Sequence, residues 1–216
     1  MVNLSRLISF TLLLSIASIS YGSPLDNLLK PFRDPPPDVQ RGIKAFESGD
    51  YNTASRILIQ ASDYGDAEAK LYLAHLYRYG VWWRVPKNTK KALALYRESA
   101  ELGFWGAQFM LGVDNYNGDL ELGLAQDKKK AFYWFKLAAQ QRDARSQVQV
   151  AQAYWEGEGT AQDYIYAHMW YNFAAAQGNE VGITMRDILT DQMTASQIEK
   201  AQDLARQCLK KNYKDC

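Results

Sequence analysis

GTAQDYIYAHMWYNFAAAQG, residues 159–178, resembles an earlier stretch of the chain, GLAQDKKKAFYWFKLAAQQR, residues 123–142, with which it shares nine of its 20 residues in register. Both stretches place an aspartate four residues before an alanine, with large aromatic residues after it. Four such alanines recur at intervals of 36 to 39 residues: Ala54, Ala92, Ala131 and Ala167. An interval of this length is typical of stacked helical hairpins, each of which hides its apolar face only against its neighbours.

The repeated positions mark the second helix of each hairpin. An Asp or Asn four residues before the alanine accepts hydrogen bonds from the first free N–H groups of a helix. The alanine and a small residue eight positions later share one face, so they let a neighbouring helix approach closely. A glycine eleven positions after the alanine ends the helix in the left-handed conformation, although Arg142 replaces it in one unit. The expected caps are Asp50, Asn88, Asp127 and Asp163; the small residues are Ser62, Ala100, Ala139 and Ala175; the glycines are Gly65, Gly103 and Gly178.

A first helix is expected before each of these second helices. It carries Leu or Val, then a small residue, then an aromatic residue, and it ends at Gly80, Gly118 or Gly157. In the first unit, residues 42–49 take this part. The predicted units are 39–66, 67–104, 105–143 and 144–178, followed by a capping segment, 179–212, and a tail, 213–216.

The capping segment is predicted to hold two helices. Residues 180–190 form the first, and Thr194 with Gln197 is a capping box that opens a helix to about residue 211. One stripe of that helix is expected to pack inward. It consists of Ile198, Ala201, Ala205, Cys208 and Leu209.

At these residues the chain resembles the Sel-one-like repeat family, a relative of the tetratricopeptide repeats. The resemblance covers about residues 39–212 and is closest in AQAYWEGEGTAQDYIYAHMWYNFAAAQG, residues 151–178. The middle units depart from the family pattern, since Asn115 stands where the family usually has tyrosine and the loops after Gly80 and Gly118 are longer. The resemblance implies an all-α fold, a right-handed αα-hairpin solenoid of about four to five repeats with a C-terminal capping helix.

The N-terminus is predicted to be a secretory signal peptide, residues 1–22. Arg6 precedes an apolar run, residues 7–19, and small residues stand before the expected cleavage after Gly22. The run would be about 20 Å long as a helix, which is short of the roughly 30 Å of a bilayer core, so a stable membrane span is the weaker interpretation. Residues 23–38 contain three consecutive prolines and are expected to form an extended lead-in.

Composition limits the partners and the compartment. The chain has 25 Lys and Arg against 24 Asp and Glu, a net charge of +1, which argues against a nucleic-acid partner. Its two cysteines, Cys208 and Cys216, fit a disulfide in an oxidising compartment, worth about 2.5 kcal/mol in the chain-entropy model. Two free thiols are the alternative. Their spacing is not the Cys-x-x-Cys arrangement of a redox-active pair.

Motifs for catalysis or metal binding are not found. His75 and His168 have no partner at metal-ligand spacing, so they are interpreted as ordinary surface or groove histidines. DNYNGDLE, residues 114–121, would need carboxylates at Val113 and Leu124 to be a calcium loop. The sequence therefore predicts no cofactor, no metal and no catalytic residue.

The residues expected to contact a partner follow from the analogy with tetratricopeptide arrays, in which first helices line the concave groove. Carried onto this chain, the groove residues are His75, Arg78, Tyr79, Tyr116, Asn117, Gln152 and Trp155. The alternative is that several of these residues merely pack against the next hairpin. Trp82 and Trp83, in an enlarged loop, either pack on the neighbouring loop or form a second contact, because exposed tryptophan is enriched in binding hot spots.

These features predict an exported, non-enzymatic scaffold that binds a peptide or a partner protein, placed in the periplasm or secreted. Stacked helices offer extended surface for recognition. A peptidoglycan-associated or β-lactam-interacting envelope protein is one alternative, which the resemblance suggests weakly because related cysteine-rich members carry a cysteine pair in each repeat. A secreted effector is the other.

Overall fold

The structure is a computed structural model that describes residues 37–81, 85–214 and 216. Residues Val39–Cys216 form one compact unit. The predicted signal peptide, most of the predicted lead-in, and Trp82 and Trp83 lie outside the described residues.

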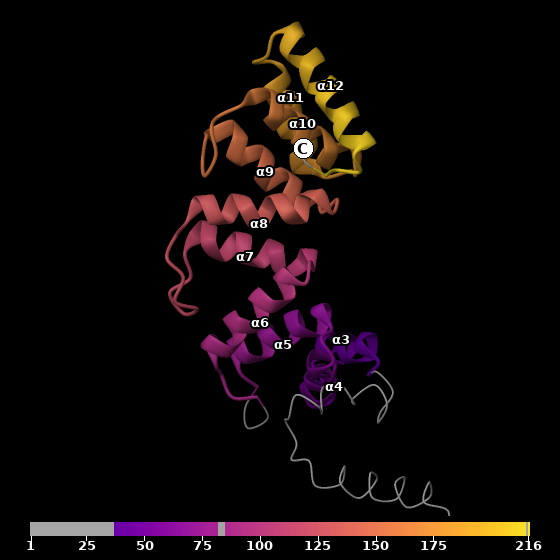
Figure 1. Cartoon of the computed structure of the whole chain (residues 1–216), viewed down its shortest axis with the longest axis vertical. Helices are drawn as coiled ribbons and strands as arrows, with labels where there is room; N and C mark the ends of the chain where they lie inside the picture. Colours follow the sequence, from indigo (N-terminus) through magenta and orange to yellow (C-terminus); the bar gives the residue numbers. More distant parts are fainter. Residues whose placement is uncertain (1–36, 82–84, 215) are drawn as a thin grey trace, which may run out of the picture. The chain divides into compact units, whose positions relative to one another are not determined.

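The described residues form ten α-helices and no strand (Figure 1). This confirms the predicted all-α class. Two isolated bridges, Val81 with Val85 and Asp119 with Leu124, close the loops that follow α5 and α7. The helices are α3 Val39–Glu47, α4 Tyr51–Asp63, α5 Ala67–Tyr79, α6 Thr89–Glu101, α7 Trp105–Asn117, α8 Lys128–Gln140, α9 Ala144–Glu156, α10 Tyr164–Ala176, α11 Glu180–Thr190 and α12 Ala195–Lys210.

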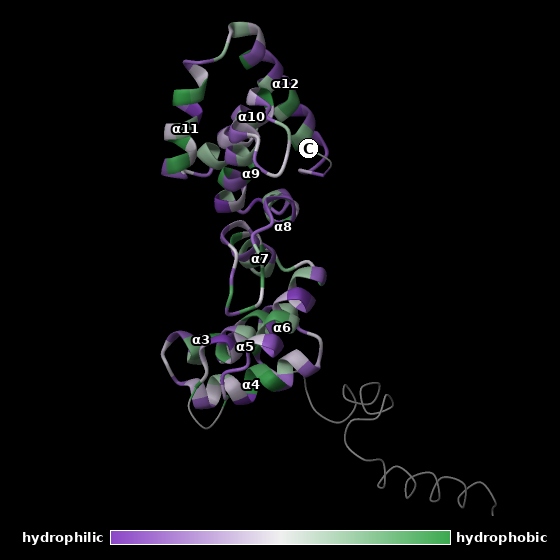
Figure 2. Cartoon of the chain, turned by 90° about the vertical axis from the view of Figure 1, so that its left-hand side faces the viewer, coloured by the Kyte–Doolittle hydropathy of each residue, from purple (hydrophilic) through white to green (hydrophobic). Residues whose placement is uncertain are grey.

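Successive helices pack as hairpins that stack on one another. Helix α3 pairs with α4, α5 with α6, α7 with α8 and α9 with α10, and the second helix of each hairpin packs on the first helix of the next. Hydrophobic and hydrophilic residues alternate along the helices (Figure 2), as expected where each helix buries one face. The buried side chains form one cluster from Ile43 to Leu122 and another from Ala131 to Tyr213, so neighbouring hairpins share each core.

The predicted caps of the second helices are confirmed. The side chain of Asp163 accepts hydrogen bonds from the N–H groups of Ile165, at 2.9 Å, and Tyr166, at 3.1 Å. Asp50, Asn88 and Asp127 each accept one from the third residue that follows, at 3.1, 2.9 and 3.0 Å. First helices use the same device at Asp66, Asp143 and Asn179, whereas Phe104 precedes α7 without a side-chain cap.

Removing one cap is expected to have a moderate effect. Asp163→Ala leaves the first N–H groups of α10 without their acceptor, so the free energy of unfolding should fall by about 1 kcal/mol. Urea denaturation measures the change. Asp191→Ala, at an exposed carboxylate that follows α11, is the matched control and should stay within about 0.5 kcal/mol of the parent protein. Equal losses for both variants would contradict the capping role.

The small residues predicted at the contacts between helices are all buried, the most exposed being Ala175 at 8%. The contact between α7 and α8 is particularly tight at Gly112. A Cβ at this position would lie 2.4 Å from two ring carbons of Phe135, whose side chain is itself buried. Gly112 therefore sets the distance between these two helices.

A methyl group at Gly112 should consequently overpack the contact. Gly112→Ala is expected to lower the free energy of unfolding by about 1–3 kcal/mol, although alanine is the better helix former. Adding Phe135→Leu to this variant should recover part of the loss, because the smaller side chain leaves room for the methyl group. A double-mutant cycle by chemical denaturation checks the coupling, and strictly additive effects would contradict it.

The second helices end as predicted. Gly65, Gly103 and Gly178 have φ values of 90°, 91° and 79°, in the left-handed region that glycine favours. Arg142, at the equivalent position of the third unit, adopts the same conformation with φ of 71°. The helix end is thus conserved in geometry between units, even where the residue type is not.

The two helices of a hairpin are joined by one recurring hydrogen bond. The backbone N–H of the capping residue donates to a carbonyl near the end of the first helix: Asn88 to Tyr77 at 2.7 Å, Asp127 to Asn115 at 2.7 Å and Asp163 to Tyr154 at 2.8 Å. Asn115 therefore occupies the place that tyrosine holds in the other two units. The longer loops after Gly80 and Gly118 leave this junction unchanged.

The C-terminal helices follow the prediction except at one residue. The capping box of Thr194 and Gln197 is present, and α12 packs mainly on α10. Ala201, Ala205 and Cys208 are buried, but Leu209 is 52% exposed, so the prediction that it packs inward is wrong. Leu209 follows Cys208 by one residue, about 100° around the helix, which places it beyond the buried stripe.

A disulfide joins Cys208 at the end of α12 to Cys216, with 5.4 Å between their Cα atoms. The bond closes a loop of the chain that carries Tyr213, whose side chain is buried against Phe173 with 4.9 Å between ring centroids. The tail is therefore fastened to the core at two points.

Candidate functional site

The predicted groove residues lie on the C-terminal halves of three first helices, α5, α7 and α9, which together form what we call the first-helix face. Tyr79 is 68% exposed and Asn117 is also exposed, whereas the other five side chains are half-buried. They are His75, Arg78, Tyr116, Gln152 and Trp155. The structure places His75 and Arg78 in a cluster between α5 and α7, and Tyr116 and Gln152 in another between α7 and α9.

The first cluster is centred on Arg78 of α5. Its guanidinium lies 3.4 Å from both carboxylate oxygens of Asp114 on α7, and it also pairs with Asp119 in the following loop. Burial raises the pKa of Asp114, while the positive charge of Arg78 acts in the opposite direction. Asp114 and Asp119 belong to residues 114–121, the segment compared with a calcium loop in the sequence. In the described structure, both carboxylates bind Arg78, an arginine of the preceding hairpin.

His75 lies beside this cluster and is enclosed by aromatic rings. Its Nδ1 is 3.0 Å from the hydroxyl oxygen of Tyr96, and the centroid of its ring lies 6.2 Å from that of Phe46 and 6.4 Å from that of Tyr72. Burial, and secondarily the charge of Arg78, lowers the pKa of His75 to about 4. His75 is therefore a neutral packing residue at physiological pH rather than a free groove residue.

The other histidine is also part of the core. His168 on α10 is only 6% exposed, and its Nε2 is 3.1 Å from the hydroxyl oxygen of Thr190. Burial lowers its pKa. The interpretation of His168 as a surface or groove histidine is therefore wrong, because α11 covers it.

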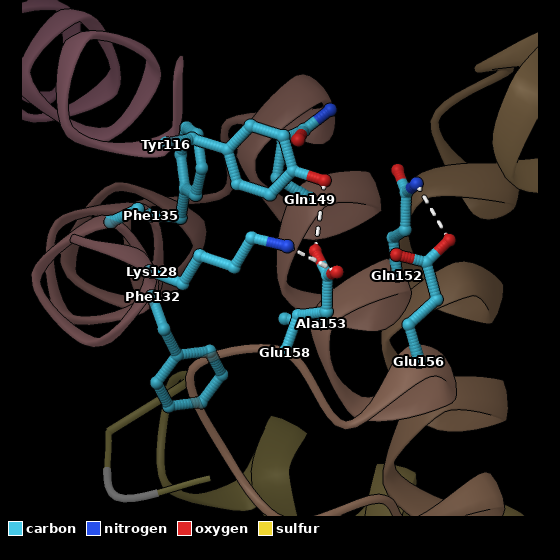
Figure 3. Close-up of a pocket in the computed structure, with 10 residues that line it drawn as sticks. Tyr116, Lys128, Phe132, Phe135, Gln149, Gln152, Ala153, Glu156 and Glu158 are labelled. Carbon is cyan, nitrogen blue, oxygen red and sulfur yellow. Dashed lines mark hydrogen bonds and ion pairs between the residues drawn. The ribbon is translucent and has the colours of Figure 1, made fainter. Parts of the chain in front are cut away.

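The second cluster is a pocket between α7 and α9, which we call the α7–α9 pocket (Figure 3). Phe132 and Phe135 of α8 form its apolar wall, and Gln149 and Gln152 of α9 supply amides. Glu158, in the loop after α9, points between Tyr116 and Lys128 in Figure 3. The hydroxyl of Tyr116 donates to Glu158 at 3.0 Å, and the Lys128 ammonium pairs with the other carboxylate oxygen.

Charge in the α7–α9 pocket is partly unbalanced. The hydrogen bond from Lys128, then that from Tyr116, lowers the pKa of Glu158, so its carboxylate is held ionised. Glu156 is the second carboxylate, exposed at the pocket rim, where it accepts a hydrogen bond from Gln152 at 3.0 Å. With two carboxylates and one ammonium among the lining residues, the pocket favours a cationic or hydrogen-bond-donating group.

Two glycines determine the position of Glu158. Gly157 and Gly159 have φ values of 73° and 76°, and a Cβ at Gly159 would lie 2.2 Å from the carbonyl oxygen of Lys128. The loop therefore passes directly over the start of α8, which brings Glu158 to Lys128. The sequence analysis did not single out Lys128, Glu156 or Glu158, although the two glycines that flank Glu158 are a visible signal of a tight turn.

Trp155 is the remaining predicted groove residue. Its ring packs edge-on against Tyr171 of α10 with 6.3 Å between centroids, so part of its side chain fills the hairpin.

Within the described residues, no group of three or more His, Cys, Asp or Glu side chains could hold a metal ion. Likewise, none of the described helices combines the length and apolar character that a bilayer crossing requires.

Two solved structures are similar to this chain. A solved Sel1 repeat protein from Oxalobacter formigenes is 32% identical, with a TM-score of 0.56, over 60% of this chain and 94% of that chain. A protective antigen of uropathogenic Escherichia coli described as having an SLR fold is 25% identical, with a TM-score of 0.48, over 75% of this chain and 42% of that one. No curated protein matches the chain.

The Sel1 repeat family itself matches three consecutive stretches, residues 67–104, 105–143 and 144–179. These stretches comprise the hairpins α5–α6, α7–α8 and α9–α10. The third stretch ends at Asn179, the residue before α11. Together they make up more than half of the chain. Sel1 repeats generally mediate protein–protein interactions and are typically non-enzymatic. Both the helical hairpins and this match place the chain in the Sel1 repeat family.

Proposed function

We propose that this protein is a non-enzymatic scaffold that binds an extended segment of a partner protein along its first-helix face. The observation that carries the proposal is the α7–α9 pocket, in which an aromatic wall, two amides and two carboxylates open beside exposed residues of the same face. Tyr, Trp and amide side chains of this kind are common in protein interfaces. A Lys or Arg of the partner would pair with Glu156, since Glu158 already has Lys128 and Tyr116.

Affinity capture with the purified protein tests this proposal. A captured partner should be lost with Tyr79→Ala plus Gln152→Ala, which remove two predicted contacts without emptying the core. Tyr133→Ala plus Arg97→Gln, at exposed positions on the second helices α8 and α6, is the matched control and should retain the partner. Circular dichroism should show the same helix content for all three proteins. Equal capture by the two variants would contradict binding at the first-helix face.

We also propose that the protein is exported, to the periplasm or beyond the cell. Support comes from the charged and apolar pattern of residues 1–22 and from the disulfide between Cys208 and Cys216, because disulfides persist in oxidising compartments. Fractionation of expressing cells should place a shortened chain in the periplasm or the medium. A full-length chain with free thiols in the cytoplasm would contradict export.

A further inference from the structure

Backbone strain in this molecule gathers at one place. Among the described residues, the non-glycine residues with positive φ are Arg142 at 71°, Asn212 at 51° and Tyr213 at 63°. Arg142 follows α8, and the other two follow α12, about 70 residues later in the chain, yet the guanidinium of Arg142 lies over the Tyr213 ring, 5.7 Å from its centroid. Strained backbone of this kind clusters at functional sites, where it holds side chains in place.

A pocket opens at this strained place. Arg142, Asn212 and Lys214 line it, together with Leu137 and glutamine side chains of α7 and α8. Among the described residues that line it there is no Asp or Glu. Both cations are exposed, and neither forms an ion pair with a described residue. The pocket therefore presents two positive charges that none of its described lining residues neutralises, and we call it the Arg142–Lys214 pocket.

Arginine at position 142 is not what the fold alone would select. The equivalent position is glycine in the other three units, and this conformation is disfavoured for a non-glycine residue because its Cβ crowds the following carbonyl oxygen. The favourable interaction between a cation and the helix dipole at the C-terminal end of a helix offsets part of this conformational cost. Asn212 and Tyr213 end α12 in a similar way, since their N–H groups donate to the carbonyls of Leu209 and Cys208 at 3.0 Å, so two left-handed helix ends meet at this pocket.

Both walls of the pocket are fixed. On one side, the amide of Gln141 donates to the carbonyl of Gly103 at 2.9 Å and to the side chain of Gln108 at 2.8 Å. On the other side, Tyr213 is buried and the disulfide closes the loop of the tail. The cations are thus presented by backbone that is held on both sides, which reduces the entropy lost when a ligand binds.

We propose that the Arg142–Lys214 pocket binds an acidic peptide segment through carboxylates that pair with Arg142 and Lys214. The charges select an anion, and Leu137 with the glutamine amides offers the apolar and hydrogen-bonding surface that a peptide uses and a small free anion does not. The pocket lies at the C-terminal end of α8, whereas Lys128 of the α7–α9 pocket opens the same helix. Thirteen residues of helix separate the two by about 20 Å, so this site is independent of the proposed first-helix face.

A titration of the purified full chain with a fluorescein-labelled, amidated Glu-Asp-Leu-Glu-Asp peptide tests the proposal by fluorescence anisotropy. Binding is expected, weaker in high salt because the contacts are between exposed charges. Arg142→Gly and Lys214→Gln should each weaken it about threefold to fivefold, the size expected for losing one exposed ion pair. Arg97→Gln, which removes an exposed cation of α6, should leave the affinity unchanged.

Stability separates a binding role from a structural one. Arg142→Gly should keep or raise the thermal unfolding temperature, because glycine relieves the strain, while the peptide affinity falls. Reduction of the disulfide should also weaken peptide binding, since it frees the wall that carries Lys214. No peptide binding, equal loss with Arg97→Gln, or competition by inorganic phosphate at the same concentration as the acidic peptide would overturn the proposal, the last by showing a site for free anions.

Discussion

Trp170→Ala is expected to lower the free energy of unfolding by about 3–5 kcal/mol, the range for a large aromatic side chain removed from a core. Trp170 is fully buried on α10, where it packs edge-on against Phe173 with 5.7 Å between ring centroids. Helix α10 contacts α9, α11 and α12, so the cavity would weaken three helix contacts together. Chemical denaturation monitored by circular dichroism measures the loss.

Two variants make the Trp170 result specific. The indole N–H of Trp170 is buried without a hydrogen-bond partner, so Trp170→Phe gives up no hydrogen bond and should lose well under half as much as Trp170→Ala. Tyr133→Ala, at a side chain that is 56% exposed, should lose less than about 1 kcal/mol. Similar losses at Trp170 and Tyr133 would contradict a core shared between hairpins.

His75 should make the stability depend on pH below neutrality. Its pKa in the folded protein is about 4, against 6.5 in the unfolded chain, so between these values the unfolded state binds the extra proton. The contribution of His75 is therefore complete above pH 6.5 and is lost as the pH falls towards 4. The difference between pH 7 and pH 5 should be about 2 kcal/mol for a shift of this size.

Comparison with His75→Gln isolates this effect. The raised pKa of Asp114 acts in the opposite sense near pH 4, and the lowered pKa of His168 acts in the same sense, but both groups remain in the variant. Arg78 and the hydroxyls of Tyr72 and Tyr96, which also surround the ring, do not titrate between pH 5 and 7. The free energy of unfolding of His75→Gln should thus depend less on pH, by about 2 kcal/mol over this range. Parallel pH profiles would contradict the assignment.

The fold could be predicted from the sequence because its signals are local and repeated. The caps Asp50, Asn88, Asp127 and Asp163 each act within their own first turn, and the alanines mark one helix face. Arg142 also ends its helix in the left-handed conformation, although it is not glycine. Leu209 was misplaced because the width of a buried stripe is set by what packs on it, here α10, and not by the helix alone.

The candidate site could be predicted only in part, because its contacts cross between repeats. The residues of the first-helix face were named from an analogy, but the pairs Arg78 with Asp114 and Lys128 with Glu158 join positions 36 and 30 residues apart. One sequence contains no sign of which charge on one hairpin meets which on the next. The aromatic surroundings of His75 and the burial of His168 also arise from neighbouring hairpins.

Site-specific photocrosslinking tests most directly whether partners bind the face that the stacked hairpins line up. A photoreactive phenylalanine analogue is placed at Tyr79 or Gln152 on the first-helix face, or at Tyr133 on a second helix, in otherwise identical proteins expressed in the cell of origin. The account predicts a discrete crosslinked protein from Tyr79 and Gln152, and none from Tyr133. Crosslinks from Tyr133 alone, or the same products from all three positions, would contradict it.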